Sequence, residues 1–194
     1  MDEDIEFRIK QVQAGEIHSY HYIVVKFQQP IFIYCWRLLG SRVEAEDAVQ
    51  DILVKAFEKI HMYKSSVTFS SWLYKIAYHH CLNILHRKKL QHKMLLGLFK
   101  THKTADSAEQ VVEHGLFSRP LSVALEKLSA EERSLLVLRI FEEKSFSEIG
   151  DIMNKNMEAV KKKYSRTIAK LRTTMNNLEE DEVCIPYKTA TKPT

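Results

Sequence analysis

The sequence predicts an all-α protein made of two small helical domains joined by a flexible linker. Apolar residues recur every three or four positions almost throughout the chain, which is the period of an amphipathic helix. Only five Gly and four Pro occur in 194 residues, too few for a turn-rich sheet protein or a Gly-rich phosphate loop. The periodicity weakens over residues 93–119, which is unusually long for a loop inside one compact domain.

This linker separates a first domain, residues 1–92, from a second domain, residues 120–178. In the first domain we expect helices at residues 3–15, 18–39, 44–60 and 71–89, with a loop at 63–70. Pro30 predicts a kink or a break in the second of these helices, because proline removes a backbone donor. Residues 179–194 are predicted to be a disordered tail.

The second domain carries the signals of a helix-turn-helix. Ser129 followed by Glu132 predicts a capping box that opens a helix at residues 130–141. A short helix at 147–153 is followed by Asn154, which tolerates a left-handed turn, and Asn156 caps a last helix at 157–178. A short helix, a tight turn and a longer basic helix are the spacing of a helix-turn-helix.

Positive charge is concentrated in two segments although the formal net charge is only +4. Residues 61–93 hold six Lys and Arg and no Asp or Glu, and residues 155–172 hold seven Lys and Arg against one Glu. Two cationic surfaces in an otherwise balanced chain predict a polyanionic partner such as nucleic acid. The five His between residues 61 and 92 are expected to add charge there as the pH falls.

The last helix is predicted to carry the residues that contact duplex DNA. Its outward-facing residues are Asn156, Glu158, Ala159, Lys161, Lys162, Lys163 and Arg166. Such a helix fits the major groove, where early side chains reach base edges and later bases meet phosphates. The alternative is an ordinary solvated face rich in Lys.

Two segments together resemble one family. Residues 121–172 resemble the promoter-distal domain of bacterial RNA polymerase sigma factors of the extracytoplasmic-function (ECF) class, and residues 30–60 with 69–89 resemble their other domain. The order and separation also match. The resemblance implies a stress-response sigma factor that binds core RNA polymerase, directs it to promoter DNA, melts the minus-10 element and binds the minus-35 element as duplex. It also implies an anti-sigma factor as a further partner. Lys155, where the family usually has an apolar residue, and Asn154, where Gly is frequent, depart from the pattern.

The acidic helix at residues 44–60 has an unusual outer face. With its apolar stripe turned inward, the outer residues are Asp47, Gln50, Asp51 and Val54. An apolar side chain among acceptors suits docking against a basic partner helix, although a plain wet helix face is the alternative. The resemblance implies that this face grips a coiled coil of the largest polymerase subunit.

The basic helix that follows is predicted to hold single-stranded DNA. The expected contacts are Lys64, Ser65, Ser66 and Phe69 from the loop, and Lys75, His79, Asn83 and Arg87 from one helix face. Cations would neutralise phosphates, aromatic stacking contributes about 1–3 kcal/mol per base, and flipping a base out costs only a few kcal/mol. The resemblance implies capture of the non-template strand of the minus-10 element. A Trp in this position is more often a core residue than a contact, so we expect Trp72 to support the loop.

Other classes of function find little support in the sequence. Cys35, Cys81 and Cys184 are widely spaced and are interpreted as reduced thiols, and the His residues lack a third ligand at regular spacing, so we expect no metal and no cofactor. No catalytic constellation, signal peptide or membrane-spanning run is visible, so we expect a cytoplasmic protein that is not an enzyme and does not insert into membranes. Two alternatives remain: a helix-turn-helix regulator that binds duplex DNA without polymerase, and an adaptor that binds only protein.

Overall fold

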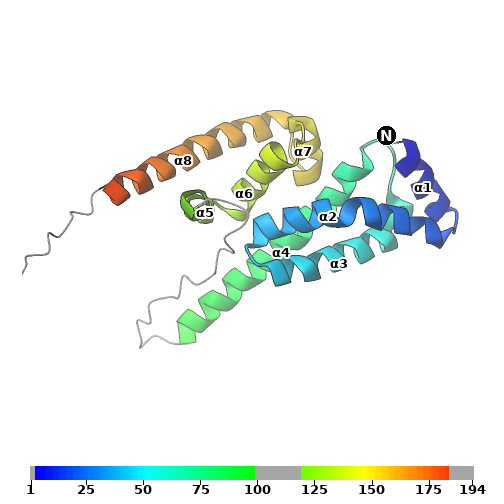
Figure 1. Cartoon of the computed structure of the whole chain (residues 1–194), viewed down its shortest axis with the longest axis horizontal. Helices are drawn as coiled ribbons and strands as arrows, with labels where there is room; N and C mark the ends of the chain where they lie inside the picture. The colour runs from blue at the N-terminus through cyan, green and yellow to red at the C-terminus, as the bar shows by residue number, and fades with distance from the viewer. Residues whose placement is uncertain (1–2, 99–118, 184–194) are drawn as a thin grey trace, which may run out of the picture.

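The computed structural model describes residues 3–98 and 119–183, and within these ranges every regular element is a helix (Figure 1). The first unit consists of α1 (Glu3–Gln13), α2 (Tyr20–Leu39), α3 (Arg42–Lys59) and α4 (Phe69–Leu98). The second unit consists of α5 (Arg119–Glu126), α6 (Ala130–Leu136), α7 (Phe146–Met153) and α8 (Met157–Val183). Short turns at Ile17–Ser19 and Ile60–Met62 are 3-10 helical, and Val137–Phe141 is π-helical. The predicted all-α class is confirmed.

Local signals set the helix ends of the first unit. Gly40 ends α2 in a left-handed conformation with φ of 75°, and its N–H donates to the carbonyl of Trp36. The Ser41 side chain then accepts from the backbone N–H of Glu44 and caps α3. Of the two alternatives predicted at Pro30, a kink or a break, the break does not occur, because α2 is one helix through Pro30. Burial of Ile31 and Tyr34 directly after it helps to offset the lost backbone bond.

α4 is longer than the sequence suggested. The expected end lay near Lys89, but the helix continues to Leu98 and so includes the first residues of the predicted linker. Residues 86–96 contain Lys, Leu, Gln and Met, which are good helix formers, and no Gly or Pro before Gly97. Residues 99–118, the rest of the linker, lie outside the described part of the chain, as do residues 184–194.

The helix-turn-helix is confirmed in the second unit. Ser129 and Ser145 each form a complete capping box with the Glu three residues later. Asn154 takes the left-handed conformation with φ of 53°, and the Asn156 side chain accepts from the N–H of Ala159 at 2.7 Å. The predicted turn and cap between α7 and α8 therefore form as expected from local residue chemistry.

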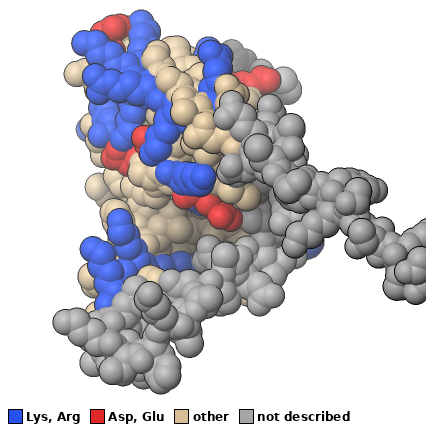
Figure 2. Space-filling model, turned by 90° about the vertical axis from the view of Figure 1, so that its left-hand side faces the viewer, with Lys and Arg blue, Asp and Glu red and all other residues tan. Residues whose placement is uncertain are grey.

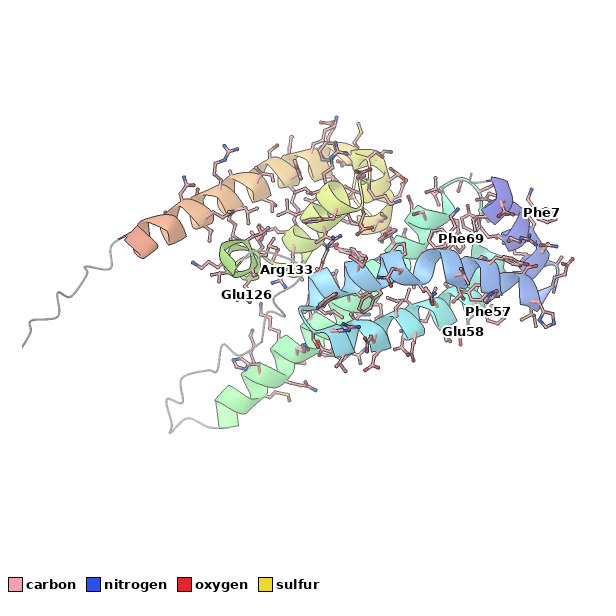
Figure 3. All side chains as sticks on the ribbon, viewed as in Figure 1. Phe7, Phe57, Glu58, Phe69, Glu126 and Arg133 are labelled. Carbon is pink, nitrogen blue, oxygen red and sulfur yellow. The ribbon has the colours of Figure 1, made fainter. Side chains whose placement is uncertain are left out.

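The two units pack closely against each other. The Tyr34 hydroxyl and the Ser134 hydroxyl are 2.8 Å apart in a buried position between α2 and α6. Arg133 donates to the carbonyl of Leu38 at 3.1 Å, and Figure 3 shows its side chain between α6 and the end of α2. One continuous buried apolar cluster includes Leu73 of the first unit and Ile149 of the second. The units are therefore joined by a shared core as well as by the linker.

Candidate nucleic-acid interfaces

A cationic groove lies between the carboxyl end of α3 and the exposed side of α4. Its volume is about 400 Å³. The residues that line it are Lys55, Lys59, Met62, Trp72, Lys75, Ile76, His79, His80, Asn83 and Arg87. We call this the α3–α4 groove. Four of its side chains are cations and none is an acid, while Met62, Trp72 and Ile76 give it an apolar part.

The structure brings together half of the residues predicted to hold single-stranded DNA. Lys75, His79, Asn83 and Arg87 all line the α3–α4 groove. Lys64, Ser65 and Ser66 are exposed in the loop before α4 but do not line the groove.

Phe69, which was also predicted to contact DNA, lies in the core of the first unit. Its ring is only 3% exposed and packs 5.5 Å from the Phe27 ring and 5.3 Å from the Trp72 ring, between centroids. A buried ring offers no face on which a base could stack, so Phe69 supports Trp72 instead. Trp72 also contacts Tyr63 at 5.6 Å, which agrees with the supporting role predicted for Trp72, although its side chain reaches the groove as well.

His80 connects the groove to the outer face of α3. Its Nδ1 lies 2.7 Å from Lys55 Nζ, and its Nε2 lies 3.7 Å from Asp51 Oδ2. Burial and the adjacent Lys55 lower the pKa of His80 below its usual 6.5, and burial and Lys75 lower the pKa of His79. These two His therefore resist the protonation that the sequence analysis expected of all five.

The outer face of α3 is available to a partner. Asp47, Gln50, Asp51 and Val54 are all exposed, and Val54 is 57% exposed, a large value for an apolar side chain. The opposite stripe, represented by Ala45, Ala48, Ile52 and Ala56, is completely or almost completely buried. The predicted division of this helix into a core stripe and an outer patch is thus present.

The first turns of α8 present most of the residues predicted to contact duplex DNA. Asn156, Glu158, Ala159, Lys162 and Arg166 are exposed. Lys161 is half-buried and donates to Glu158 at 2.9 Å, so part of its charge is already compensated.

Lys163 and Lys155 both contact Glu131 of α6. Lys155 Nζ is 3.4 Å from Glu131 Oε1, and Lys163 donates to Glu131 Oε2. The hydrogen bond from Lys163 is the main cause that holds the pKa of Glu131 below its usual value. Lys155, which departs from the family pattern, therefore turns toward a carboxylate. Figure 2 shows Lys and Arg gathered in two separate areas, one at the top over α8 and one lower down near the end of α4.

Some functional candidates were missed by sequence reasoning. Lys55 and Lys59 of α3 and His80 of α4 also line the α3–α4 groove, although none of them was among the predicted DNA contacts. The spacing of Lys55 and Lys59 could have indicated their position. They follow Asp51 at intervals of four residues, so they lie beside the outer patch of the helix.

Residues 3–98 and 119–183 contain no candidate metal site and no candidate membrane-spanning helix. In this part of the chain no group of three or more His, Cys, Asp and Glu side chains could hold a metal ion. None of the helices described is both long and apolar enough to cross a membrane. Cys35 and Cys81 are free thiols in the core with sulfur atoms 3.6 Å apart.

A helical unit with a cationic groove, followed by a helix-turn-helix unit, defines a two-domain DNA-binding protein. Comparison with known families gives the class. Residues 23–91 match Sigma-70 region 2, and residues 124–173 match Sigma-70 region 4. The chain is 30% identical to the ECF RNA polymerase sigma factor SigW of Bacillus subtilis over 92% of this chain and the full length of SigW. The chain belongs to the ECF family of RNA polymerase sigma factors, and it directs RNA polymerase to promoters.

Other relatives agree with this assignment. RNA polymerase sigma factor YlaC of Bacillus subtilis is 30% identical over 81% of this chain and 92% of YlaC. Sigma factor RpoE of Bartonella quintana, solved with the anti-sigma factor NepR, has a TM-score of 0.64 at 20% identity and covers 81% of this chain and 96% of RpoE. CnrH, solved with the cytosolic domain of CnrY, has a TM-score of 0.65 at 19% identity and covers 91% of this chain and 99% of CnrH. At these identities the two structures support the fold.

Proposed function

We propose that the two units divide promoter recognition between them. The outer face of α3 binds core RNA polymerase, the α3–α4 groove holds the melted non-template strand of the minus-10 element, and α8 reads the minus-35 element as duplex. The protein then acts as an initiation factor and not as a catalyst, in the cytoplasm where the polymerase works.

The α3–α4 groove is the observation that carries the proposal. Its volume of about 400 Å³ falls within the range of about 300–1,000 Å³ that is usual for ligand sites. Lys75 and Arg87 project from the same face of α4 and supply cations along a path that a phosphate backbone can follow. Trp72 and Ile76 give an apolar surface against which one unstacked base can rest. Binding of duplex DNA by α8 alone would leave this groove unused.

The α8 surface supports duplex recognition. The Asn156 side chain is used for the helix cap, and the exposed residues that follow it include Glu158, Ala159 and Lys162. Small and polar side chains at the beginning of a recognition helix reach base edges, and Arg166, two turns further, is placed for a phosphate. α8 and α3 lie on opposite sides of the molecule, so polymerase and duplex can be bound together (Figure 1).

Transcription by reconstituted holoenzyme tests the proposal. Run-off transcription on genomic fragments identifies a promoter, and permanganate reactivity of thymines reports melting at its minus-10 element. We expect Lys75→Ala with Arg87→Ala to reduce melting at least tenfold while core binding persists, and Asp51→Lys to reduce core binding. Lys10→Ala, which changes an exposed lysine of α1 that does not line the groove, is the matched control. Failure of the wild-type chain to bind core polymerase would sink the proposal.

We also propose that an anti-sigma factor regulates the protein. Support comes from RpoE and CnrH, whose solved structures contain NepR and CnrY respectively. A pull-down from the native host with the full chain, followed by inhibition of run-off transcription by the captured protein, tests this point. A captured protein that leaves transcription unchanged is not an anti-sigma factor.

A further inference from the structure

α3 presents groups to both of the proposed partners. Asp51 and Val54 belong to its outer face, whereas Lys55 and Lys59 line the α3–α4 groove. Asp51 and Lys55 are one helical turn apart, so the polymerase face and the strand groove meet along this edge of the helix. A side chain that contacts both residues would connect the two surfaces directly.

His80 of α4 is that side chain. It is 8% exposed, and it reaches Lys55 through Nδ1 at 2.7 Å and Asp51 through Nε2 at 3.7 Å. An ammonium group can only donate, so Nδ1 must accept, and the ring hydrogen is therefore on Nε2, on the side of Asp51. At 3.7 Å the second distance is too long for a hydrogen bond, so the Nε2–H of the neutral ring faces the Asp51 carboxylate only as a weaker charge–dipole contact.

The groups around His80 favour this neutral form. Lys55 and Asp51 of α3 and Arg87 of α4 are the charged groups that act on it. Burial and the two cations oppose a charge on the ring, and only Asp51 favours one. A neutral ring can hold a lysine, whereas a charged ring would repel it.

A histidine with a purely structural role would not account for the contact with Lys55. A His that only filled space between α3 and α4 would need a single acceptor or a water, and it would gain nothing from contact with an ammonium group. In this structure Lys55 donates to the His80 ring. This contact limits the rotamers of the flexible Lys55 side chain and holds its charge beside the groove.

We propose that His80 is a positioning residue that fixes Lys55 at the edge of the α3–α4 groove, where Lys55 contacts a phosphate of the bound single strand. This inference rests on the proposed function, because it assumes that the groove holds that strand. It adds Lys55 to the DNA contacts and makes α3 a helix that serves polymerase on one side and DNA on the other.

Salt-dependent strand binding by the holoenzyme tests the inference. The probe is a fluorescent non-template oligonucleotide that carries the minus-10 element of a promoter found by run-off transcription. Each phosphate contact adds about 0.7 to the slope of log affinity against log salt concentration for single strands. We therefore expect Lys55→Met to reduce this slope by about 0.7 and the affinity by about fivefold.

Variants of His80 separate positioning from packing. His80→Leu removes both nitrogens, and we expect the same slope and affinity as for Lys55→Met, with no further loss in the double variant. His80→Gln keeps an acceptor for Lys55 and a donor for Asp51, so it should restore most of the slope. If His80→Leu melts early, His80→Phe keeps a ring and serves the same purpose. Lys10→Met is the control.

Three results would overturn the inference: an unchanged slope for Lys55→Met, a full slope for His80→Leu, or losses that add in the double variant. The Lys75→Met and Arg87→Met variants show whether such a result contradicts only the role of His80 or also the proposed function of the groove. If these two also leave strand affinity unchanged, the groove does not hold the strand and the proposed function fails. If they weaken binding while the Lys55 and His80 variants do not, only this inference falls.

Discussion

Gly150 allows the close approach of α7 and the turn that follows it. A Cβ atom added at this position would lie 2.6 Å from the backbone carbonyl oxygen of Lys155, which cannot move aside like a flexible side chain. Overpacking of this kind costs about 1–3 kcal/mol, and the better helix propensity of Ala returns about 1 kcal/mol at most. We predict that Gly150→Ala lowers the free energy of unfolding, measured by urea titration.

Ser147→Ala is the matched control for Gly150, because it lies on the exposed side of the same helix. Surface changes away from caps stay within about 0.5 kcal/mol. Equal stability of the Gly150 and Ser147 variants would mean that the turn can relax and that Gly150 is not required there.

The stability of the protein should fall as the pH drops through the histidine range. The folded-state pKa values of His79 and His80 are lowered from 6.5, with burial as the first cause for both. The unfolded chain therefore binds protons first, so stability that is full above pH 6.5 is lost as the pH falls toward the folded values. We predict a lower melting temperature at about pH 5.5 than at about pH 7.5, with a smaller decrease for His80→Gln. An equal decrease in melting temperature for the wild type and His80→Gln would show that His80 does not cause the pH dependence of stability.

Residue roles that depend on neighbours in the chain could be predicted, and those that depend on packing could not. Ser129, Asn154 and Asn156 act within a few residues of their own position, so their capping roles are readable from sequence. Lys55 acquires its place only from the way α3 packs against α4. The burial of Phe69 likewise depends on α2, through Phe27.

At the scale of elements, α8 shows how tertiary contacts distinguish adjacent lysines. Lys162 is exposed, whereas Lys163 is half-buried and paired with Glu131 of α6. A phosphate contact adds about 0.9 to the salt slope for duplex DNA. We predict that Lys162→Ala reduces the slope for a minus-35 duplex bound by holoenzyme by about 0.9, and that Lys163→Ala reduces it by less.

The Lys163 variant should act mainly on stability. Removal of Lys163 leaves Glu131 with Lys155 at 3.4 Å and with a side-chain hydrogen bond to Tyr78, so the carboxylate keeps two partners and the loss should be about 1 kcal/mol or less. Thermal melting measures this effect. A full reduction of the salt slope by Lys163→Ala would mean that Lys163 leaves Glu131 when DNA binds.

Element types were predictable here, but two element ends were not. α4 and α8 both continue beyond the expected ends, to Leu98 and Val183, because the segments that follow contain no strong helix breaker at the expected positions. The predicted helix at residues 130–141 covers the right span, yet its second half, Val137–Phe141, is π-helical. Apolar periodicity indicates a buried face without resolving how tightly the turns are wound.

At the scale of the whole molecule, the sequence predicted two domains but not their contact. A flexible linker implied independent units, whereas α7 packs against α4 close to the α3–α4 groove. The Asn154 side chain is 3.3 Å from His79 Nε2, and Lys144 donates to Ser70 at 2.7 Å. These contacts join residues about 75 positions apart in the sequence, so they cannot be predicted from local sequence patterns. The family resemblance likewise does not specify that the two units pack against each other.

Glu142 connects the two units by accepting hydrogen bonds from Arg37 of α2, at 3.2 Å, and from the Tyr74 hydroxyl of α4. Its side chain is 11% exposed, so Glu142→Ala would leave two half-buried or buried donors without this partner, a loss of about 1–3 kcal/mol. Because the loss falls between the units, it favours separation over unfolding, and we predict a larger radius of gyration for the free protein in small-angle scattering. Glu46→Ala, which breaks an exposed pair with Arg42, should leave the radius unchanged. A lower melting temperature for Glu142→Ala with an unchanged radius would show instead that Glu142 supports the core of the first unit and does not hold the two units together.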